Sequence, residues 1–589
     1  MEERCGNNLF ISSLGDRQKA ASYLSKALDV ELTIAKESAL FLNEQQQKKY
    51  WNNFNLNLQG IQSFCSRSDE AITISSGIFD FYLEAQGSIL NSKKQLLAAA
   101  SSSQDATVQK AYRDFMRNGS ILFAEENLPI SDRHIDTDSL REDVQQLEAR
   151  LTRLGAEKLN IETRATVDWK DIGAALEPGE VAVAFSHFKY RGLNGWTDSV
   201  IYIAYVMPYG ATHPDFIQLF EEKELKGLLN RAEMDPNLIY GYDPDFDDDE
   251  YQGREIWNLV WGKLNNYIEG SHHIYFSTTG LLSELNLAAL PDGLDEMYRP
   301  MLVNRDMIQM VHAGNVVEKK QNNLGILKGP IVAFGGLNYD IDDDEWLAET
   351  GDQKTGTRGS GYFATDSTRS GFKYLPYTLS EVESLAGMAE EHSIPIKVYT
   401  GNSGLEEQYR QLAGESSPQI LHLATHAAFL EDAEMDTEVL GAEKYQYNAQ
   451  KDPMYRSRLM LSGANRTLKG DAIPEGVLDG VLTAQDVSTI LLPNTELVVL
   501  SACETGVGDY DASEGVYGLQ RAFQAVGIDN LVMTLFEIND AATSVFMQSF
   551  YEQLFEGKSY HEAMRITQIR MIESRYNQPV NWAGIILLQ

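Results

Sequence analysis

Two predicted strands end next to side chains that could carry out chemistry together. The strand QILHLAT (419–425) is followed by His426, and the strand ELVVLSA (496–502) is followed by Cys503. In an open parallel sheet, both side chains would lie beyond the carboxyl ends of the strands, where such sheets place their sites. An imidazole that takes the proton from a thiol creates a thiolate, which attacks carbonyl carbon. The pair therefore predicts nucleophilic acyl transfer, with His426 as base and Cys503 as nucleophile.

Each of these residues also has a structural interpretation. A lone cysteine such as Cys503 is commonly a buried core thiol, and His426 alone could be a hydrogen-bonded histidine at a strand end. His422 precedes His426 by four residues, so a zinc pair is conceivable, but no Cys or carboxylate cluster completes it. We therefore predict a satisfied sheet histidine at this position, no metal and no other cofactor. Gly506 and Gly508 allow a sharp turn after Cys503 that would bring backbone N–H groups toward a developing oxyanion.

The elements that must position this pair form an α/β pattern. From about residue 330, buried strands at 331–335, 396–400 and 530–536 are separated by amphipathic helices. Strands that are apolar on both faces indicate a parallel sheet covered by helices on each side. An earlier run, with strands at 181–185, 199–208 and 273–277, also alternates with helical stretches. We therefore predict two α/β subdomains.

The residues before these subdomains predict helix throughout 16–155, because Pro129 is the only proline between positions 1 and 177. A 34-residue repeat is not evident, so a plain helical bundle is favoured and degenerate TPR-like hairpins are the alternative. The predicted regions are thus helical residues 1–160, an α/β subdomain at 165–325 and a catalytic subdomain at 326–589.

Two long polar segments, 337–372 and 431–456, interrupt the second subdomain and predict functional loops. We predict that the basic residues of both segments are accessible. These residues are Lys354, Arg358 and Arg369 in the first loop and Lys444, Lys451 and Arg456 in the second.

Composition excludes several classes of function. The 589 residues contain 49 Lys plus Arg against 86 Asp plus Glu, a formal net charge of −37. Such a charge argues against nucleic-acid binding, because phosphates would be repelled from most of the surface. Neither a membrane-spanning apolar run nor a signal peptide is evident, so we expect a cytoplasmic protein without membrane association. The three cysteines are too few for a disulfide framework.

In the segments that carry this chemistry, the sequence resembles the CHAT domain family, caspase-like peptidase modules often found beside TPR repeats. The similar segments are LHLATHAAF (421–429), LVVLSACETGVGD (497–509), EGVYGLQRAFQAVGIDNLVMTLFEIND (514–540) and NWAGIILLQ (581–589). Earlier segments near 178–185, at 275–293 and at 375–385 also fit the family, so the resemblance covers roughly 165–589. It implies a caspase-like parallel or mixed sheet sandwiched by helices, in which a pseudo-caspase half packs on the active half.

The resemblance also implies a cysteine peptidase of the caspase, separase and gingipain group. His426 would be the general base and Cys503 the nucleophile. The backbone N–H groups of Cys503 and Ala427 would form the oxyanion hole, although the family usually has Gly where this chain has Ala427.

The same resemblance implies a substrate pocket. Asp540, helped by Glu537, would form the floor of the S1 pocket and pair with an Arg or Lys side chain. The alternative is that Asp540 caps the helix predicted to start at Ala541.

We therefore predict a cysteine endopeptidase that cleaves a specific protein partner after Arg or Lys, with bacterial defence as a plausible setting among relatives. Control would come from a protein that docks on the N-terminal helices, or from processing in the loop 337–372 or 431–456. The alternative function is a catalytically silent caspase-fold scaffold for protein–protein interaction. Ala427 leaves room for that alternative, whereas the retained His426 and Cys503 oppose it.

Overall fold

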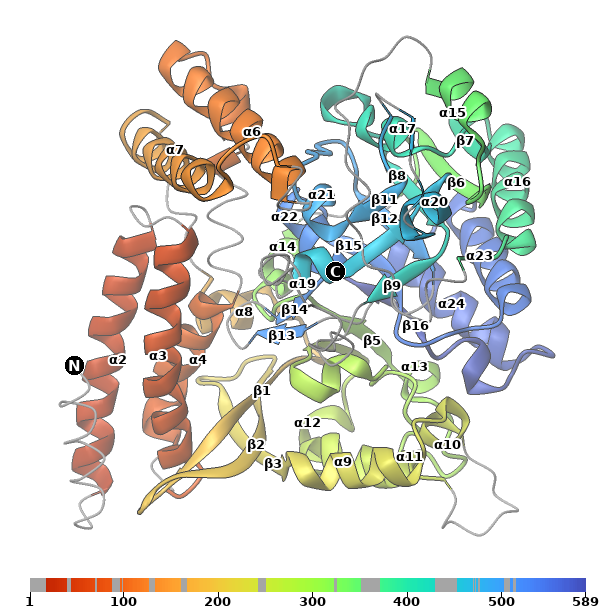
Figure 1. Cartoon of the computed structure of the whole chain (residues 1–589). Coiled ribbons are helices and arrows are strands. Elements are labelled where there is room, and N and C mark those ends of the chain that lie inside the picture. Colours follow the sequence, from red (N-terminus) through yellow and green to blue (C-terminus); the bar gives the residue numbers. More distant parts are fainter. Residues whose placement is uncertain are drawn as a thin grey trace, which may run out of the picture.

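Two open β-sheets with helices on both faces form the centre of the molecule, and further helices precede them (Figure 1). The structure is a computed structural model. It describes residues 17–39, 44–68, 71–86, 96–97, 99–126, 133–159, 167–241, 251–321, 326–350, 371–429, 453–469, 471, 473–474, 477–502, 509–511 and 515–589. The predicted fold class, an α/β fold with parallel and mixed sheets between helices and an all-α region in front, is confirmed.

The N-terminal region is helical, as predicted. Its helices are α2 (Arg17–Ala39), α3 (Glu44–Cys65), α4 (Ala71–Ala85), α6 (Ala106–Glu126) and α7 (Thr137–Lys158). The first three of these helices share a hydrophobic core with the first sheet. At that contact Phe79 stacks on Tyr205 with ring centroids 5.0 Å apart, and the Tyr82 hydroxyl donates to the Phe185 carbonyl at 2.6 Å. The α2–α4 bundle is therefore part of the α/β body.

The first sheet has the strand order β3-β2-β1-β4-β5. Its strands are β1 (Glu180–Gly192), β2 (Gly195–Pro208), β3 (Asp215–Glu221), β4 (His273–Ser277) and β5 (Asp306–Gln309). The predicted strands are all present, but β1, β2 and β3 form an antiparallel meander, while β4 and β5 run parallel to β1. The sheet is therefore mixed, and helices follow only after its third strand.

Helices cover both faces of this sheet. They are α8 (Trp169–Ala175), α9 (Glu222–Arg231), α10 (Pro236–Tyr240), α11 (Gly253–Val260), α12 (Asn265–Ile268), α13 (Met301–Asn304) and α14 (Asn315–Gln321). One face packs on α9 and α11 through buried side chains such as Leu225 and Ile256. The other face packs on α2–α4, α8 and α14.

The second sheet has the order β16-β15-β12-β8-β6-β7. Its strands are β6 (Ile331–Leu337), β7 (Ile396–Gly401), β8 (Ile420–Ala424), β12 (Leu497–Ser501), β15 (Asn530–Thr534) and β16 (Ile585–Leu588). Five of the strands are parallel, as predicted, whereas the edge strand β16 is antiparallel to β15.

Two layers of helices enclose the second sheet. On one face lie α16 (Pro376–Glu391), α23 (Asp540–Phe555) and α24 (Tyr560–Ile572), and on the other lie α17 (Glu406–Arg410), α20 (Ala464–Lys469), α21 (Ala484–Val487) and α22 (Leu519–Ala525). Successive residues of each strand alternate between the two cores, as the two-residue period of a strand requires. This alternation explains why the strands read as continuously apolar.

Smaller elements flank the second sheet. A three-stranded sheet has the order β11-β10-β9, formed by β9 (Ala427–Phe429), β10 (Ser457–Met460) and β11 (Val481–Thr483), and β13 (Asp509–Asp511) pairs with β14 (Gly515–Tyr517). The predicted loop 337–372 contains a helix, α15 (Asp343–Thr350), because Trp346 supplies a fully buried anchor.

The predicted processing residues lie mostly outside the described residues. This applies to Lys354, Arg358, Arg369, Lys444 and Lys451. The prediction that a protease could reach Arg456 is wrong, because this residue ends the short helix α19 (Pro453–Arg456) and is only 2% exposed.

The edges of the two sheets meet at Gln589, the residue that follows β16. The Gln589 N–H donates to the Gln309 carbonyl at 3.0 Å, and the Val311 N–H donates to the Gln589 carbonyl at 2.8 Å. Two hydrogen bonds in strand-like alternation therefore connect the edge of the first sheet to the edge of the second.

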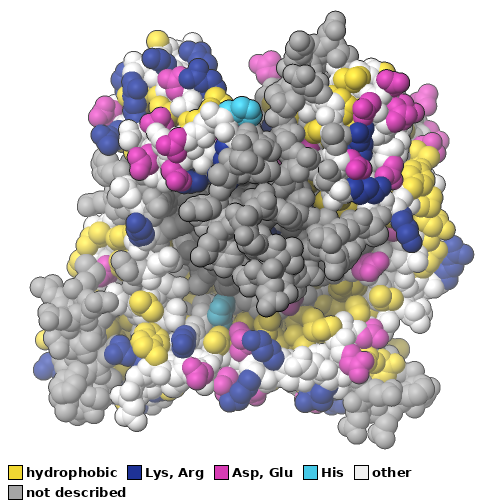
Figure 2. All heavy atoms as spheres, in the orientation of Figure 1, with side chains coloured by type: hydrophobic (Ala, Val, Ile, Leu, Met, Phe, Trp, Pro, Cys, Tyr) yellow, Lys and Arg dark blue, Asp and Glu magenta, His cyan; other side chains and the backbone are white. Residues whose placement is uncertain are grey.

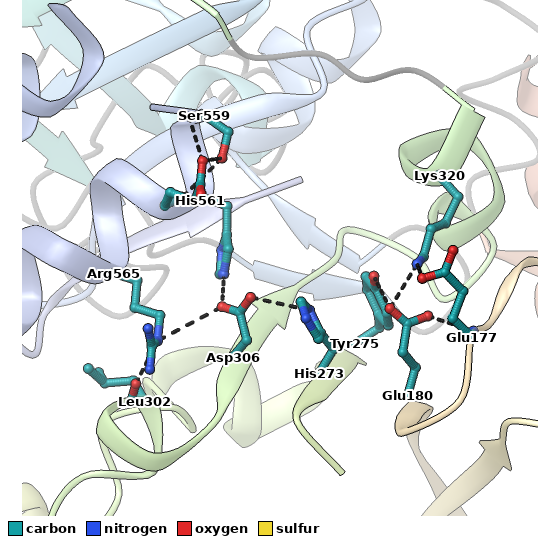
Figure 3. Close-up of polar contacts among 11 residues, drawn as sticks. Glu177, Glu180, His273, Tyr275, Leu302, Asp306, Lys320, Ser559, His561 and Arg565 are labelled. Atoms are coloured by element: carbon teal, nitrogen blue, oxygen red, sulfur yellow. Dashed lines mark hydrogen bonds and ion pairs between the residues drawn. The ribbon is translucent and has the colours of Figure 1, made fainter. Parts of the chain in front are cut away.

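A polar cluster around Asp306 joins the two halves a few residues from this contact (Figure 3). Asp306, the first residue of β5, binds His561 of α24, and Arg565 of α24 lies 3.9 Å from the same carboxylate. His273 approaches the other carboxylate oxygen at 3.2 Å. Burial raises the pKa of Asp306, but His561, His273 and Arg565 together hold it below its ordinary value. The ionised carboxylate thus holds both halves together.

Candidate active site

The predicted catalytic residues follow two neighbouring parallel strands. β8 and β12 pair residue for residue from Ile420 and Leu497 to Ala424 and Ser501, and every residue in both strands is buried. Both strands therefore end at the same level of the sheet. His426 stands two positions after Ala424 in the sequence, and position 503 stands two positions after Ser501.

His426 is half-buried and held in a defined orientation. Its Nε2 lies 2.7 Å from the Lys373 carbonyl oxygen, and its ring contacts Phe372 and Tyr339 with centroid distances of 4.7 and 5.2 Å. Because a carbonyl only accepts hydrogen bonds, Nε2 carries the proton of the neutral ring. Nδ1 is then the nitrogen with a lone pair, which a general base requires.

Burial lowers the pKa of His426, and this is the largest effect on it. The Lys373 carbonyl and the charges of Asp540 and Glu537 act in the opposite direction, because each stabilises the imidazolium. The net shift is downward, so the ring is neutral near pH 7 and able to accept a proton.

The backbone on both sides of His426 is fixed by hydrogen bonds. The buried Thr425 hydroxyl donates to the Met460 carbonyl, and it accepts from the Tyr339 hydroxyl at 3.0 Å. The Met460 N–H in turn donates to the His426 carbonyl at 2.9 Å. Burial raises the pKa of Tyr339 to about 12, so the phenol keeps its proton and remains a donor.

The Ala427 N–H points away from the neighbouring strand. Ala427 is opposite Leu459 in the β9–β10 ladder. Because the Met460 N–H binds the His426 carbonyl, the Ala427–Leu459 pair is the non-hydrogen-bonded kind, whose N–H groups face outward. β9 is also the edge strand of its sheet. An outward N–H directly after the base is the geometry that an oxyanion-hole donor needs.

Asp540 and Glu537 lie close enough to His426 for their charges to act on its imidazole. Asp540 is partly exposed and Glu537 is exposed, while Ile538 between them is buried. The cap of α23 is Asn539, whose side chain accepts from the Ala541 N–H at 3.0 Å. The alternative prediction that Asp540 caps this helix is therefore wrong.

Cys503 itself lies outside the described residues, as do Gly506 and Gly508. Its pairing with His426 and its contribution to the oxyanion hole stay predictions. The residues before it are described, and Ser501 and Ala502 are both buried. The Thr534 hydroxyl of β15 donates to the Ala502 carbonyl at 2.5 Å. The chain is thus held at the residue that precedes the predicted nucleophile.

His422 has partners of its own in the core. It is fully buried, its Nδ1 lies 3.0 Å from the Tyr551 hydroxyl, and its Nε2 lies 2.8 Å from Glu381 Oε1. His426 contacts none of these groups. In the part of the chain that the structure describes, no three His, Cys, Asp or Glu side chains gather as metal ligands would.

Sequence reasoning missed the residues that support His426. Tyr339 and Phe372 fall in the segment 337–372, whose Gly- and Asp-rich composition predicts only a loop. Lys373 acts through its backbone carbonyl, which no side-chain pattern can reveal. These contacts join positions up to 87 residues apart, and only the fold brings them together.

The family model of the CHAT domain matches residues 250–589, more than half of the chain. The chain therefore belongs to the CHAT domain family. Tetratricopeptide repeat protein 28 of Homo sapiens is 34% identical to it over 112 residues, which are 18% of this chain and 4% of that protein. The protein of the same name from Mus musculus gives the same figures. The chain thus matches a small part of the length of these relatives.

Two solved structures align with weaker similarity. The Saccharomyces cerevisiae separase–securin complex aligns at 9% identity with a TM-score of 0.39, covering 97% of this chain and 37% of that chain. The Arg-specific cysteine proteinase gingipain R aligns at 8% identity with a TM-score of 0.31, covering 62% of this chain and 74% of that chain. These TM-scores are low, so membership of the family rests on the sequence match.

Among the described residues, no helix combines the length and apolar character needed to cross a membrane.

Proposed function

We propose that the chain is a cysteine endopeptidase in which His426 activates Cys503. The observation that carries the proposal is the orientation of His426, whose Nε2–H is held by the Lys373 carbonyl at 2.7 Å. This arrangement leaves the lone pair on Nδ1, which can then accept a proton from a thiol. The matched ends of β8 and β12 support the pairing, because His426 and Cys503 each follow their strand by the same number of residues.

The proposed reaction starts with transfer of the Cys503 thiol proton to His426 Nδ1. The thiolate then attacks the scissile carbonyl carbon, and a C–S bond forms while the carbonyl oxygen becomes an oxyanion. The outward Ala427 N–H and the Cys503 N–H bind this oxyanion. The imidazolium gives its proton to the leaving nitrogen as the C–N bond breaks. Water, deprotonated by His426, then hydrolyses the thioester and restores the thiol.

We assign Asp540, supported by Glu537, to recognition of a basic P1 side chain. Both carboxylates act on His426, so they lie near the reacting bond of a bound substrate. Asp540 is not engaged as a helix cap, since Asn539 fills that role. A partly exposed carboxylate in this place favours Arg, which binds it with two parallel hydrogen bonds, or Lys.

The expected substrate is a specific protein in the cytoplasm, and control would come from a partner that docks on the N-terminal helices or from processing. In this proposal residues 326–589 are the catalytic subdomain and 165–325 the pseudo-caspase half. The shared edge at Gln589 and the Asp306 cluster support a single working unit.

The test is cleavage of arginyl and lysyl peptides and of candidate partner proteins by the purified full chain. Cys503→Ala is expected to abolish cleavage, while Cys65→Ala is the matched control. Burial raises the pKa of the Cys65 thiol, so this thiol stays protonated and inert. Cleavage that persists in Cys503→Ala would overturn the assignment. A wild-type chain that binds partners but cuts none would instead be the silent scaffold, which Ala427 leaves open.

A further inference from the structure

The helices α6 and α7 form a hairpin with a hydrophobic cluster of its own. Leu151 of α7 packs against Val108 and Ala111 of α6 in this cluster. Lys158, at the end of α7, pairs with Asp105, just before α6, at 2.8 Å. The two helices are therefore antiparallel, and the start of α6 lies beside the end of α7. In Figure 1 the hairpin stands apart from α2–α4 at the upper edge of the molecule.

Four cations gather at this end of the hairpin. Lys110 and Arg113 are one turn apart on α6, and Arg150 and Arg153 are one turn apart on α7. All four side chains are exposed, and they define what we call the basic hairpin surface. Figure 2 shows dark blue side chains over α6 and α7, with magenta side chains among them. Because the α6 start meets the α7 end, the two pairs occur at the same level of the hairpin.

These four cations have no carboxylate partners in the part of the chain that the structure describes. Among the described residues, none of the four has an acidic side chain within ion-pair distance. Some other cations of the described chain are paired; Arg410, for example, binds Glu406 and Asp486.

Four carboxylates lie at this level of the hairpin. Asp114 faces the neighbouring Arg117 at 3.9 Å, Asp105 pairs with Lys158 at 2.8 Å, and Glu148 and Glu157 are the others. In a chain with a net charge of −37, this cluster of exposed cations without carboxylate partners is available to an outside anion.

We propose that the basic hairpin surface docks an acidic segment of a partner protein. The inference rests on the proposed function, because it specifies the partner expected on the N-terminal helices as an acidic segment and places its binding site on the basic hairpin surface. Guanidinium groups recognise carboxylates through paired hydrogen bonds, and four exposed cations at one level of the hairpin would attract an extended or helical acidic segment. A nucleic acid is disfavoured, because its continuous phosphate backbone would extend beyond the four cations and meet the acidic surface of the rest of the chain, whereas a short acidic segment would not.

The test measures binding of a fluorescent polyglutamate peptide to the full chain by anisotropy, at low and at physiological salt. The variant Arg113→Glu/Arg150→Glu reverses two of the cations. The control Lys189→Glu/Lys397→Glu makes the same change in net charge at exposed lysines on β1 and β7. We expect binding by the wild type and the control, with affinity reduced by about tenfold or more in the hairpin variant.

Equal affinity in the hairpin variant and the wild type, or no peptide binding at low salt, would overturn the proposal. Preferential binding of a single-stranded oligonucleotide over the peptide would also overturn it. So would a salt-sensitive dimer that the hairpin variant loses, because the occupant would then be a second copy. None of these readouts uses peptidase activity, so their failure is distinct from failure of the proposed reaction.

Discussion

Replacing Asp540 by Asn removes one negative charge beside His426 and leaves the size of the side chain unchanged. If this carboxylate receives the guanidinium of a P1 arginine, the substitution removes a charge-assisted hydrogen bond. Such bonds to charged groups contribute about 1.5–3 kcal/mol. At about 1.4 kcal/mol per factor of ten, kcat/KM for an arginyl substrate should fall by about 10- to 100-fold.

The fold should tolerate the substitution, because Asn539 continues to cap α23 through the Ala541 N–H at 3.0 Å. Asp540 also sits in the first turn of the helix, where a negative charge contributes about 0.3–1 kcal/mol through the helix dipole. A small fall in melting temperature is therefore expected, without unfolding. Glu537→Gln is the matched control, since Glu537 acts on His426 as well but is exposed.

The assay compares kcat/KM for two peptides that differ only at P1, one with Arg and one with citrulline, its neutral analogue. The account predicts that the Arg-to-citrulline ratio falls by about 10- to 100-fold in Asp540→Asn and changes by only a few-fold in Glu537→Gln. A folded Asp540→Asn variant with the wild-type ratio would show that the S1 pocket lies elsewhere.

Three further predictions concern the supports of the site and the contact between the two halves. Burial lowers the pKa of His426, so the acid limb of kcat/KM should have its midpoint below the ordinary value of about 6.5. Glu537→Gln removes a charge that raises this pKa, so it should move the midpoint lower still. A midpoint above about 6.5 in the wild type would contradict the assignment. Tyr339→Phe removes the hydroxyl that donates to Thr425 at 3.0 Å. Denaturant unfolding should show a free energy of unfolding lower by about 0.5–1.5 kcal/mol, and kcat should also fall. Unchanged kinetics would show that this support is not needed. The pKa of Asp306 is depressed, so the contribution of this carboxylate to stability is complete above its unfolded pKa of about 3.8 and is lost as pH falls through the lower folded pKa. Asp306→Asn should therefore be less stable than the wild type at neutral pH, and the difference in thermal unfolding should shrink below about pH 3.8. A difference that stays constant with pH would contradict this linkage.

The strands and their ends could be predicted from the sequence, because apolar runs that end in Gly, Asn or polar residues are local signals. The antiparallel direction of β2 relative to β1 could not be predicted in the same way. The tip between Gly192 and Gly195 joins β1 to β2 as a hairpin, and glycines at both ends of a short connection favour such a turn. The long apolar run that follows obscured this signal, and an alternating α/β pattern was predicted instead.

The strand ends that His426 and position 503 follow could be predicted from topology, whereas the supports of His426 required the fold. Thr425 is adjacent to His426 in sequence, but its partners Tyr339 and Met460 come from distant segments. The N-cap of α23 could not be predicted from the sequence for a different reason. Asn539 and Asp540 are adjacent and both suit an N-cap, so local sequence does not decide between them. The buried Ile538 fixes the entry of the chain and leaves Asn539 at the cap.

The most direct test of the central claim is covalent labelling of the full chain by an arginyl chloromethyl ketone at neutral pH, read by intact mass and peptide mapping. The account predicts one adduct on Cys503, none on the buried Cys65, and labelling of Cys503 that is much slower in His426→Ala because the thiol loses its base. A folded chain that stays unlabelled, or a Cys503 that reacts at the same rate without His426, would contradict the proposed catalytic pair.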